Sequence, residues 1–190
     1  LPSEITETTN DGETETREYT RYYPGTTKLA ERQRYKNDEL DGQPAWETWN
    51  EAGQYTSIEF YNAGALTYRS ETGYNGALLS SYRVTSYNGE TITRENLTRY
   101  HPDSTTISLH SVETLTDEGR YALSESFYAD GTQKERLERL DGKKNGLQQT
   151  WNEAGYKTKE QFYLDGQLDG IQRTFDSLGL PVTETTYLLG

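Results

Sequence analysis

The sequence predicts an all-β protein, an elongated array of sequential antiparallel β-hairpins that form a twisted single sheet or half-pipe. Turn-forming residues recur about every 12 residues, and the segments between them are rich in Thr, Tyr and β-branched residues. No segment carries an apolar stripe with the 3.6-residue period of a helix. Only 31% of the 190 residues are hydrophobic, but 16 Tyr, 4 Phe and 3 Trp favour an ordered sheet with little deep core.

A repeat of 24 residues is clearest in the C-terminal third, where Gly142 and Gly166 begin successive copies. An earlier copy, residues 49–64, is identical to residues 151–166 at 9 of 16 positions. Self-similarity of this kind indicates stacked units that contact mainly their neighbours along the chain.

Each repeat divides into halves of about 12 residues, and each half fits one strand and one tight turn. The turns contain residues that tolerate a positive φ, as in Asn88-Gly89 and Asp165-Gly166. Two halves therefore make a hairpin, and about 14 strands follow one another as a meander. The predicted turn positions are Gly12, Gly25, Asp38, Gly53, Gly64, Gly76, Gly89, Asp103, Gly119, Gly131, Gly142, Gly155, Gly166, Gly179 and Gly190.

The sequence predicts one repeat domain, residues 19–190, after an acidic flexible segment, residues 1–18, with six acidic residues and one Arg. From about residue 65 to 116 the turn spacing persists without the motif, so we expect degenerate repeats with longer loops there. The interval from Gly42 to Trp49 is two residues longer than in the C-terminal copies, which predicts a bulge or wider loop near Pro44.

The repeat resembles the bacterial variant of the MORN repeat (membrane occupation and recognition nexus). The resemblance rests on Trp/Phe-x-x-x-Gly, then seven residues to Tyr-x-x-Gly, and on the recurring Leu-Asp-Gly. It covers residues 19–64 and 117–190, most clearly residues 150–170. It implies hairpins stacked into a twisted sheet, and an antitoxin-like or interaction module; some MORN proteins are associated with membranes or lipids.

Two other aromatic-glycine repeats match less well. Choline- or glucan-binding modules have units of similar length, but they carry paired Trp-Tyr-Tyr cages, whereas this chain has only Trp46, Trp49 and Trp151. The YD-type repeats of polymorphic toxins use Tyr and Gly at similar spacing and lack the recurring Leu-Asp-Gly.

Composition argues against several function classes. A net charge of −12 leaves no basic footprint for nucleic acid. There is no Cys, and the two histidines, His101 and His110, are not expected to share a metal ion. No Gly-x-Ser-x-Gly elbow or phosphate-binding loop occurs. We therefore expect no enzyme, no cofactor and no metal site.

The expected function is a non-enzymatic protein-binding repeat module, an immunity protein or antitoxin that occludes a basic toxin or secreted effector. The alternative is a cell-envelope module that binds polysaccharide or lipid headgroups through exposed aromatic side chains. Tyr and Arg outside the motif are the candidates for partner contact, although solvated side chains at an irregular edge would explain them too. They are Tyr68, Tyr74, Tyr82, Arg83, Tyr87, Arg99 and Tyr100.

The absence of Cys suits an extracytoplasmic bacterial protein of the periplasm or cell envelope, while a cytoplasmic location stays open. The sequence lacks Met even at position 1, so either a signal peptide or lipoprotein leader was removed or the sequence was shortened. Membrane contact would then be peripheral or through that removed lipid anchor. The sequence leaves the oligomeric state open.

Overall fold

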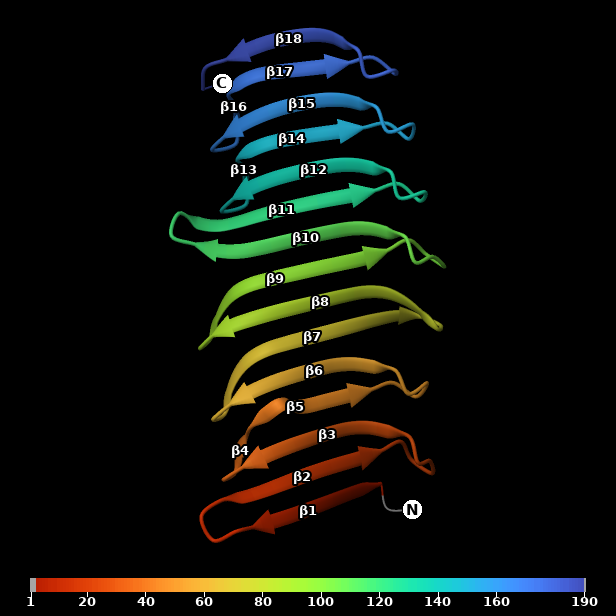
Figure 1. Cartoon of the computed structure of the whole chain (residues 1–190), viewed down its shortest axis with the longest axis vertical. Coiled ribbons are helices and arrows are strands. Elements are labelled where there is room, and N and C mark those ends of the chain that lie inside the picture. The colour runs from red at the N-terminus through yellow and green to blue at the C-terminus, as the bar shows by residue number, and fades with distance from the viewer. Residues whose placement is uncertain (1–2, 190) are drawn as a thin grey trace. The chain divides into compact units, whose positions relative to one another are not determined.

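The computed structural model describes residues 3–189, which contain strands and no helix (Figure 1). The strands form one open antiparallel sheet of sequential hairpins, which confirms the predicted fold class. No helix that could span a membrane occurs within residues 3–189. The strands are β1 (Glu4–Asn10), β2 (Glu15–Tyr22), β3 (Leu29–Lys36), β4 (Glu39–Leu40), β5 (Gly42–Trp49), β6 (Tyr55–Asn62), β7 (Ala65–Asn75), β8 (Leu78–Asn88), β9 (Thr91–Tyr100), β10 (Ile107–Thr116), β11 (Gly119–Phe127), β12 (Gln133–Leu140), β13 (Lys143–Lys144), β14 (Gly146–Trp151), β15 (Lys157–Leu164), β16 (Gln167–Leu168), β17 (Gly170–Phe175) and β18 (Pro181–Tyr187).

The chain divides into two compact units. The first contains the residues up to Gly73 together with Tyr82–Thr93, and the second contains Tyr74–Ser81 and the residues from Arg94 onward. Pairing follows chain order in each unit: β2 pairs with β1 and β3 in the first, and β11 pairs with β10 and β12 in the second.

The turn rhythm predicted from the sequence is confirmed. Every predicted turn position from Gly12 to Gly179 has a positive φ, between 55° at Asp103 and 133° at Gly119. Gly190 lies outside the described residues. Glycine and aspartate occupy these positions because a positive φ costs them less than it costs other residues.

A second feature of the repeat was not predicted. After β3, β12 and β15 the chain forms a turn, a two-residue strand and then a glycine of positive φ, before the next long strand starts. The three glycines are Gly42, Gly146 and Gly170, with φ of 136°, 93° and 67°. They account for the three short strands β4, β13 and β16.

At one such interruption, a buried glutamine side chain makes hydrogen bonds to the backbone of the neighbouring strand. The Gln172 side chain, in a residue that is 7% exposed, donates from Nε2 to the Phe162 carbonyl (3.0 Å) and accepts the Phe162 N–H at Oε1 (3.2 Å). The same Nε2 reaches the Asp169 carbonyl at 2.8 Å. Side-chain bonds thus replace backbone bonds that the interruption removes.

The N-terminal segment and the degenerate region are more regular than the sequence suggested. Residues 4–10, expected as part of a flexible acidic segment, form β1 and pair with β2 from Glu4↔Arg21 to Asn10↔Glu15. The wide turn spacings between residues 65 and 116 are taken up mainly by strands of 10 or 11 residues. Leu1 and Pro2 lie outside the described residues.

The expected distortion near Pro44 is present, because the register of β5 on β6 shifts between Gly42 and Trp46. Little of the chain is buried. Among the described residues, the buried hydrophobic side chains are Ala30, Ala45 and Trp49.

Candidate functional site

An aromatic patch, defined here as Phe60, Tyr68 and Tyr82, lies on one face of the first unit. Phe60 on β6 is directly opposite Tyr68 on β7, and their rings stack with centroids 4.7 Å apart and planes 28° apart. Tyr82 on β8 lies beside Tyr68, and interaction with the Tyr68 hydroxyl, followed by burial, raises the pKa of the Tyr82 hydroxyl. Tyr82 is nonetheless 38% exposed.

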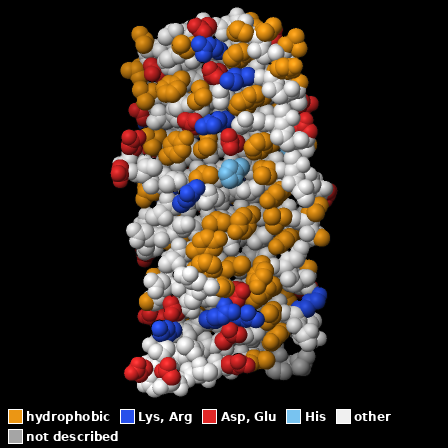
Figure 2. All heavy atoms as spheres, viewed as in Figure 1, with side chains coloured by type: hydrophobic (Ala, Val, Ile, Leu, Met, Phe, Trp, Pro, Cys, Tyr) orange, Lys and Arg blue, Asp and Glu red, His pale blue; other side chains and the backbone are white. Residues whose placement is uncertain are grey.

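Figure 2 shows hydrophobic side chains gathered over this part of the first unit, beside charged side chains over β2 and β3. Ile58, two residues before Phe60, pairs with Ser70 on one side and with Glu47 on the other. The patch therefore continues toward β5 along the same face, since paired residues point to the same side of a sheet.

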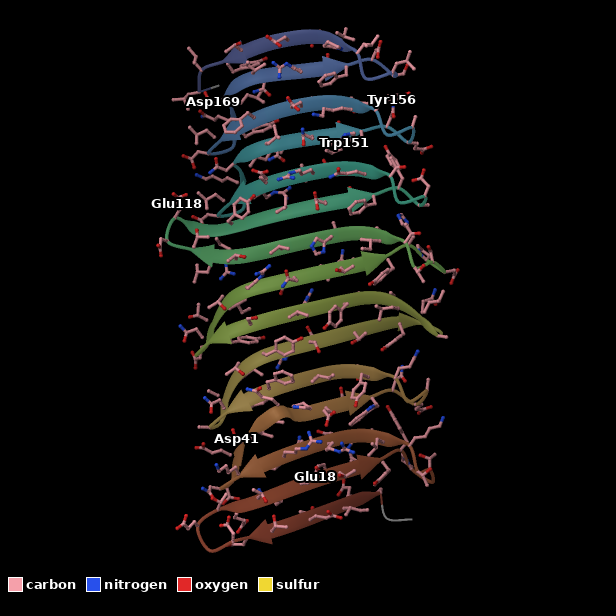
Figure 3. All side chains as sticks on the ribbon, in the orientation of Figure 1. Glu18, Asp41, Glu118, Trp151, Tyr156 and Asp169 are labelled. Atoms are coloured by element: carbon pink, nitrogen blue, oxygen red, sulfur yellow. The ribbon has the colours of Figure 1, made fainter. Side chains whose placement is uncertain are left out.

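An ion-pair cluster, defined here as Glu18, Arg32, Arg34 and Glu47, borders the patch. Arg34 lies 3.1 Å from Glu18 and 2.9 Å from Glu47, and Arg32 lies 3.5 Å and 3.6 Å from the same two carboxylates. Glu47 is buried, at 5% exposure. These charges neutralise one another, so the cluster forms a fixed polar border; Figure 3 labels Glu18 on β2.

The opposite face of the first unit holds another of the predicted residues in an ion pair. Arg83 lies 3.7 Å from Glu71. Nearby, the Tyr61 hydroxyl donates to Glu59 (2.7 Å), and Arg69 donates to the same carboxylate (2.8 Å). Burial and the bond to Glu59 raise the pKa of Tyr61 to about 12, with a further contribution from Tyr87. The polar side chains named on this face are thus already bonded to one another.

The structure therefore divides the seven predicted contact residues. It brings Tyr68 and Tyr82 together, in the aromatic patch. The other five lie elsewhere: Arg83 and Tyr87 in the first unit away from the patch, and Tyr74, Arg99 and Tyr100 in the second unit. Sequence reasoning did not name Phe60 as a contact residue, because its place opposite Tyr68 depends on the register of β6 and β7.

The repeat aromatics mainly connect successive hairpins. The Tyr23 hydroxyl donates to the Trp49 carbonyl (2.7 Å), and the Tyr128 hydroxyl donates to the Trp151 carbonyl (2.9 Å). Within its own hairpin, Trp49 also packs on Tyr55, with ring centroids 4.9 Å apart. These bonds explain the recurrence of aromatic residues beside the turns.

The two histidines have separate backbone and side-chain neighbours. His101 Nε2 lies 3.0 Å from the Phe127 carbonyl, and His110 Nδ1 lies 3.3 Å from the Thr98 hydroxyl. In the part of the chain that the structure describes, no group of three or more His, Cys, Asp or Glu side chains is placed to hold a metal ion.

The second unit carries a feature that sequence reasoning missed, an open cavity of about 540 Å³. Its walls include Asp117 and Glu118 in the β10–β11 turn, Tyr121 and Glu138 on neighbouring strands, and Phe162 on β15. Figure 3 labels Glu118 at the tip of that turn. Burial, followed by the Glu138 charge, raises the pKa of Tyr121.

A signal in the sequence marks this cavity. Phe60 and Phe162 stand four residues before the turn glycines Gly64 and Gly166, whereas Glu138 stands at that place before Gly142. Arg34 and Thr186 occupy the same place before Asp38 and Gly190, so the position varies between copies, and at Glu138 it carries a carboxylate. The Glu138 side chain is 17% exposed, so a largely buried acid lies on the sheet at this place.

Comparison with known proteins does not test the resemblance to MORN-variant repeats, which stays an interpretation of the repeat motif. The chain matches no family model, and a search of the curated proteins finds no match.

Proposed function

We propose that this chain is a non-enzymatic protein-binding repeat module that uses the aromatic patch as its main contact. One observation supports this function best: Phe60, Tyr68 and Tyr82 form a connected aromatic surface on a sheet face where the adjoining charges are already paired. Tyrosine-rich patches with a polar border have the composition of binding hot spots.

The charge of the chain favours a basic protein partner. The net charge is −12, and the ion-pair cluster beside the patch leaves other carboxylates unneutralised, such as Glu7 on the exposed strand β1. Long-range attraction would speed encounter with a basic surface, and docking on the aromatic patch would then slow dissociation.

The finer part of the proposal is neutralisation. With the resemblance to bacterial MORN-variant repeats, the module acts as an immunity protein or antitoxin that covers the active site of a toxin or secreted effector. We place it in the periplasm or cell envelope.

The test is quantitative affinity capture from a lysate of the source organism, with three forms of the chain compared by mass spectrometry. The wild type and a Tyr156→Ser variant, which removes an exposed tyrosine on a turn of the second unit, should retain one stoichiometric protein. The double variant Tyr68→Ser/Tyr82→Ser should recover at least about tenfold less of that protein, because each central aromatic side chain contributes about 1–2 kcal/mol to the binding free energy. Equal recovery by all three forms would reject the patch as the contact.

A second candidate, recognition of polysaccharide or lipid headgroups, has its own support in the exposed rings of Tyr55 and Tyr156, which are 42% and 44% exposed. Stacking on these rings would survive high salt, whereas a charge-steered protein contact should weaken as salt rises. Retention on envelope material at high salt, with no protein recovered, would favour this candidate.

A further inference from the structure

We propose that the cavity of the second unit is a receptor site for one basic side chain, an arginine or lysine, presented by a protein partner. The proposal takes from the proposed function only that the ligand is a protein. It concerns a different unit from the aromatic patch, so the two can be tested separately.

The charge of the cavity is the first argument. Three carboxylates line it, those of Asp117, Glu118 and Glu138, and no Lys or Arg is among its lining residues. Glu138 is bonded to Arg136 through Oε1 (2.9 Å). The Asp117 and Glu118 carboxylates have no ion pair or hydrogen bond with any described residue, so the site keeps a net negative charge.

The walls are the second argument, because they suit an amphipathic cation and not a bare metal ion. Tyr121 and Phe162 present aromatic rings, and Leu140 adds an aliphatic surface. A long basic side chain places its methylenes against such walls and its charge beside carboxylates or over a ring face. The same unit already uses this contact, since Lys144 Nζ lies 4.7 Å from the Tyr163 ring centroid.

The origin of the cavity is the third argument. It lies where β13 ends and Gly146 interrupts the sheet, and a Cβ at Gly146 would collide with the Glu138 carboxylate. The absent side chain therefore leaves space for Glu138 to face the cavity. Two of the other copies carry Phe60 and Phe162 at this place, and an acid there forgoes the packing of such a ring, which binding of a cation would explain.

The size of the cavity agrees with this occupant. About 540 Å³ lies within the range of roughly 300–1,000 Å³ that small-ligand sites occupy, and it admits one long side chain. The residues that would contact the guanidinium or ammonium group are Asp117, Glu118 and Glu138.

The test is an NMR titration of the full chain with the blocked peptide acetyl-Gly-Arg-Gly-amide at low salt. The control peptide carries citrulline, which has the shape of arginine without its charge. Chemical shifts at Tyr121, Phe162 and the β10–β11 turn should change and saturate with the arginine peptide. The affinity for the citrulline peptide should be at least about tenfold lower, because citrulline lacks the charge that strengthens hydrogen bonds to carboxylates.

Three variants connect binding to the cavity. Glu138→Phe introduces the residue that two other copies carry at this place, Phe60 and Phe162, and Asp117→Asn/Glu118→Gln changes only the exposed turn. Each variant should weaken binding of the arginine peptide about tenfold or more. Glu153→Gln, an exposed acid on another turn of the same unit, should leave the affinity unchanged. Equal binding of both peptides, or equal weakening by Glu153→Gln, would overturn the proposal and indicate general attraction to an acidic surface. Neither result depends on the aromatic patch.

Discussion

At the scale of single residues, polar side chains outnumber hydrophobic ones among the buried positions of residues 3–189. Glu47 and Gln172 are among these buried residues, at 5% and 7% exposure, and each is engaged by neighbouring polar groups. Because buried polar groups are costly when unpaired, each of them fixes a particular register of the strands.

Removal of the Gln172 amide tests this role. We expect Gln172→Ala to lower the free energy of unfolding by about 1–2 kcal/mol, because it removes the side-chain acceptor of the Phe162 N–H and leaves the Phe162 carbonyl with the Asp169 N–H as its backbone donor. Gln167→Ala, at an exposed position of β16, should change it by less than about 0.5 kcal/mol. Urea denaturation measures both, and equal effects would contradict the role.

Glu160 gives a pH-dependent test. Hydrogen bonds from Lys157 (2.5 Å), Gln149 and Arg173 lower the pKa of Glu160 below its ordinary value of 4.5. A lowered pKa in the folded state contributes stability that is fully present above pH 4.5 and disappears as the pH falls through the folded value. Glu160→Gln should therefore cost about 1 kcal/mol at pH 7 and progressively less in acid.

The measurement for Glu160 is the urea midpoint of wild type and Glu160→Gln between pH 7 and pH 2. The two midpoints should converge below pH 4.5. A difference that stays constant over this range would show that the carboxylate charge contributes nothing.

At the scale of elements, the hairpin and its turn were predictable and the interruption was not. Gly and Asp, which tolerate a positive φ, recur at regular spacing in the sequence. Their positions alone therefore located the predicted turns up to Gly179, all of which have a positive φ. The two-residue strands β4, β13 and β16 depend on a second glycine of positive φ. In the sequence this glycine belongs to the repeat motif, and nothing distinguishes it from the other motif residues.

The candidate site was only partly predictable for a related reason. Tyr68 and Tyr82 stood out because the repeat does not require them, but the register of β7 on β6 decides that Tyr68 meets Phe60. The cavity depends on a missing side chain at Gly146 and on one substituted position, Glu138, which only a comparison of the copies reveals.

Substitution of two glycines that have nearly the same φ can distinguish the cost of backbone strain from the cost of side-chain crowding. Gly12 (φ 94°) has no atom within 4 Å of an added Cβ, whereas at Gly146 (φ 93°) the Cβ would meet Glu138. We expect Gly12→Ala to cost about 1 kcal/mol of unfolding free energy and Gly146→Ala to cost more. In a Glu138→Ala background most of the excess cost at Gly146 should disappear, because the carboxylate is gone and only the Cβ of residue 138 stays close, at 3.3 Å. Thermal or urea unfolding measures this, and an unchanged excess would contradict crowding by the Glu138 carboxylate.

At the scale of the whole molecule, the sheet offers surfaces instead of an enclosed interior. Its faces are held by cross-strand ion pairs, hydrogen bonds and ring contacts, and the aromatic patch and the cavity are two places that leave side chains available for a partner. A repeat array can vary such places one unit at a time, because each hairpin depends mainly on its neighbours. That property suits a module whose task is recognition.

The most direct test of the account is hydrogen–deuterium exchange of the chain, free and in complex with its captured partner. The account predicts added protection in β6, β7 and β8, around Phe60, Tyr68 and Tyr82, and weaker binding when the two tyrosines are replaced. Unchanged exchange in these three strands, with protection confined to other strands, would contradict the assignment of the aromatic patch as the binding surface.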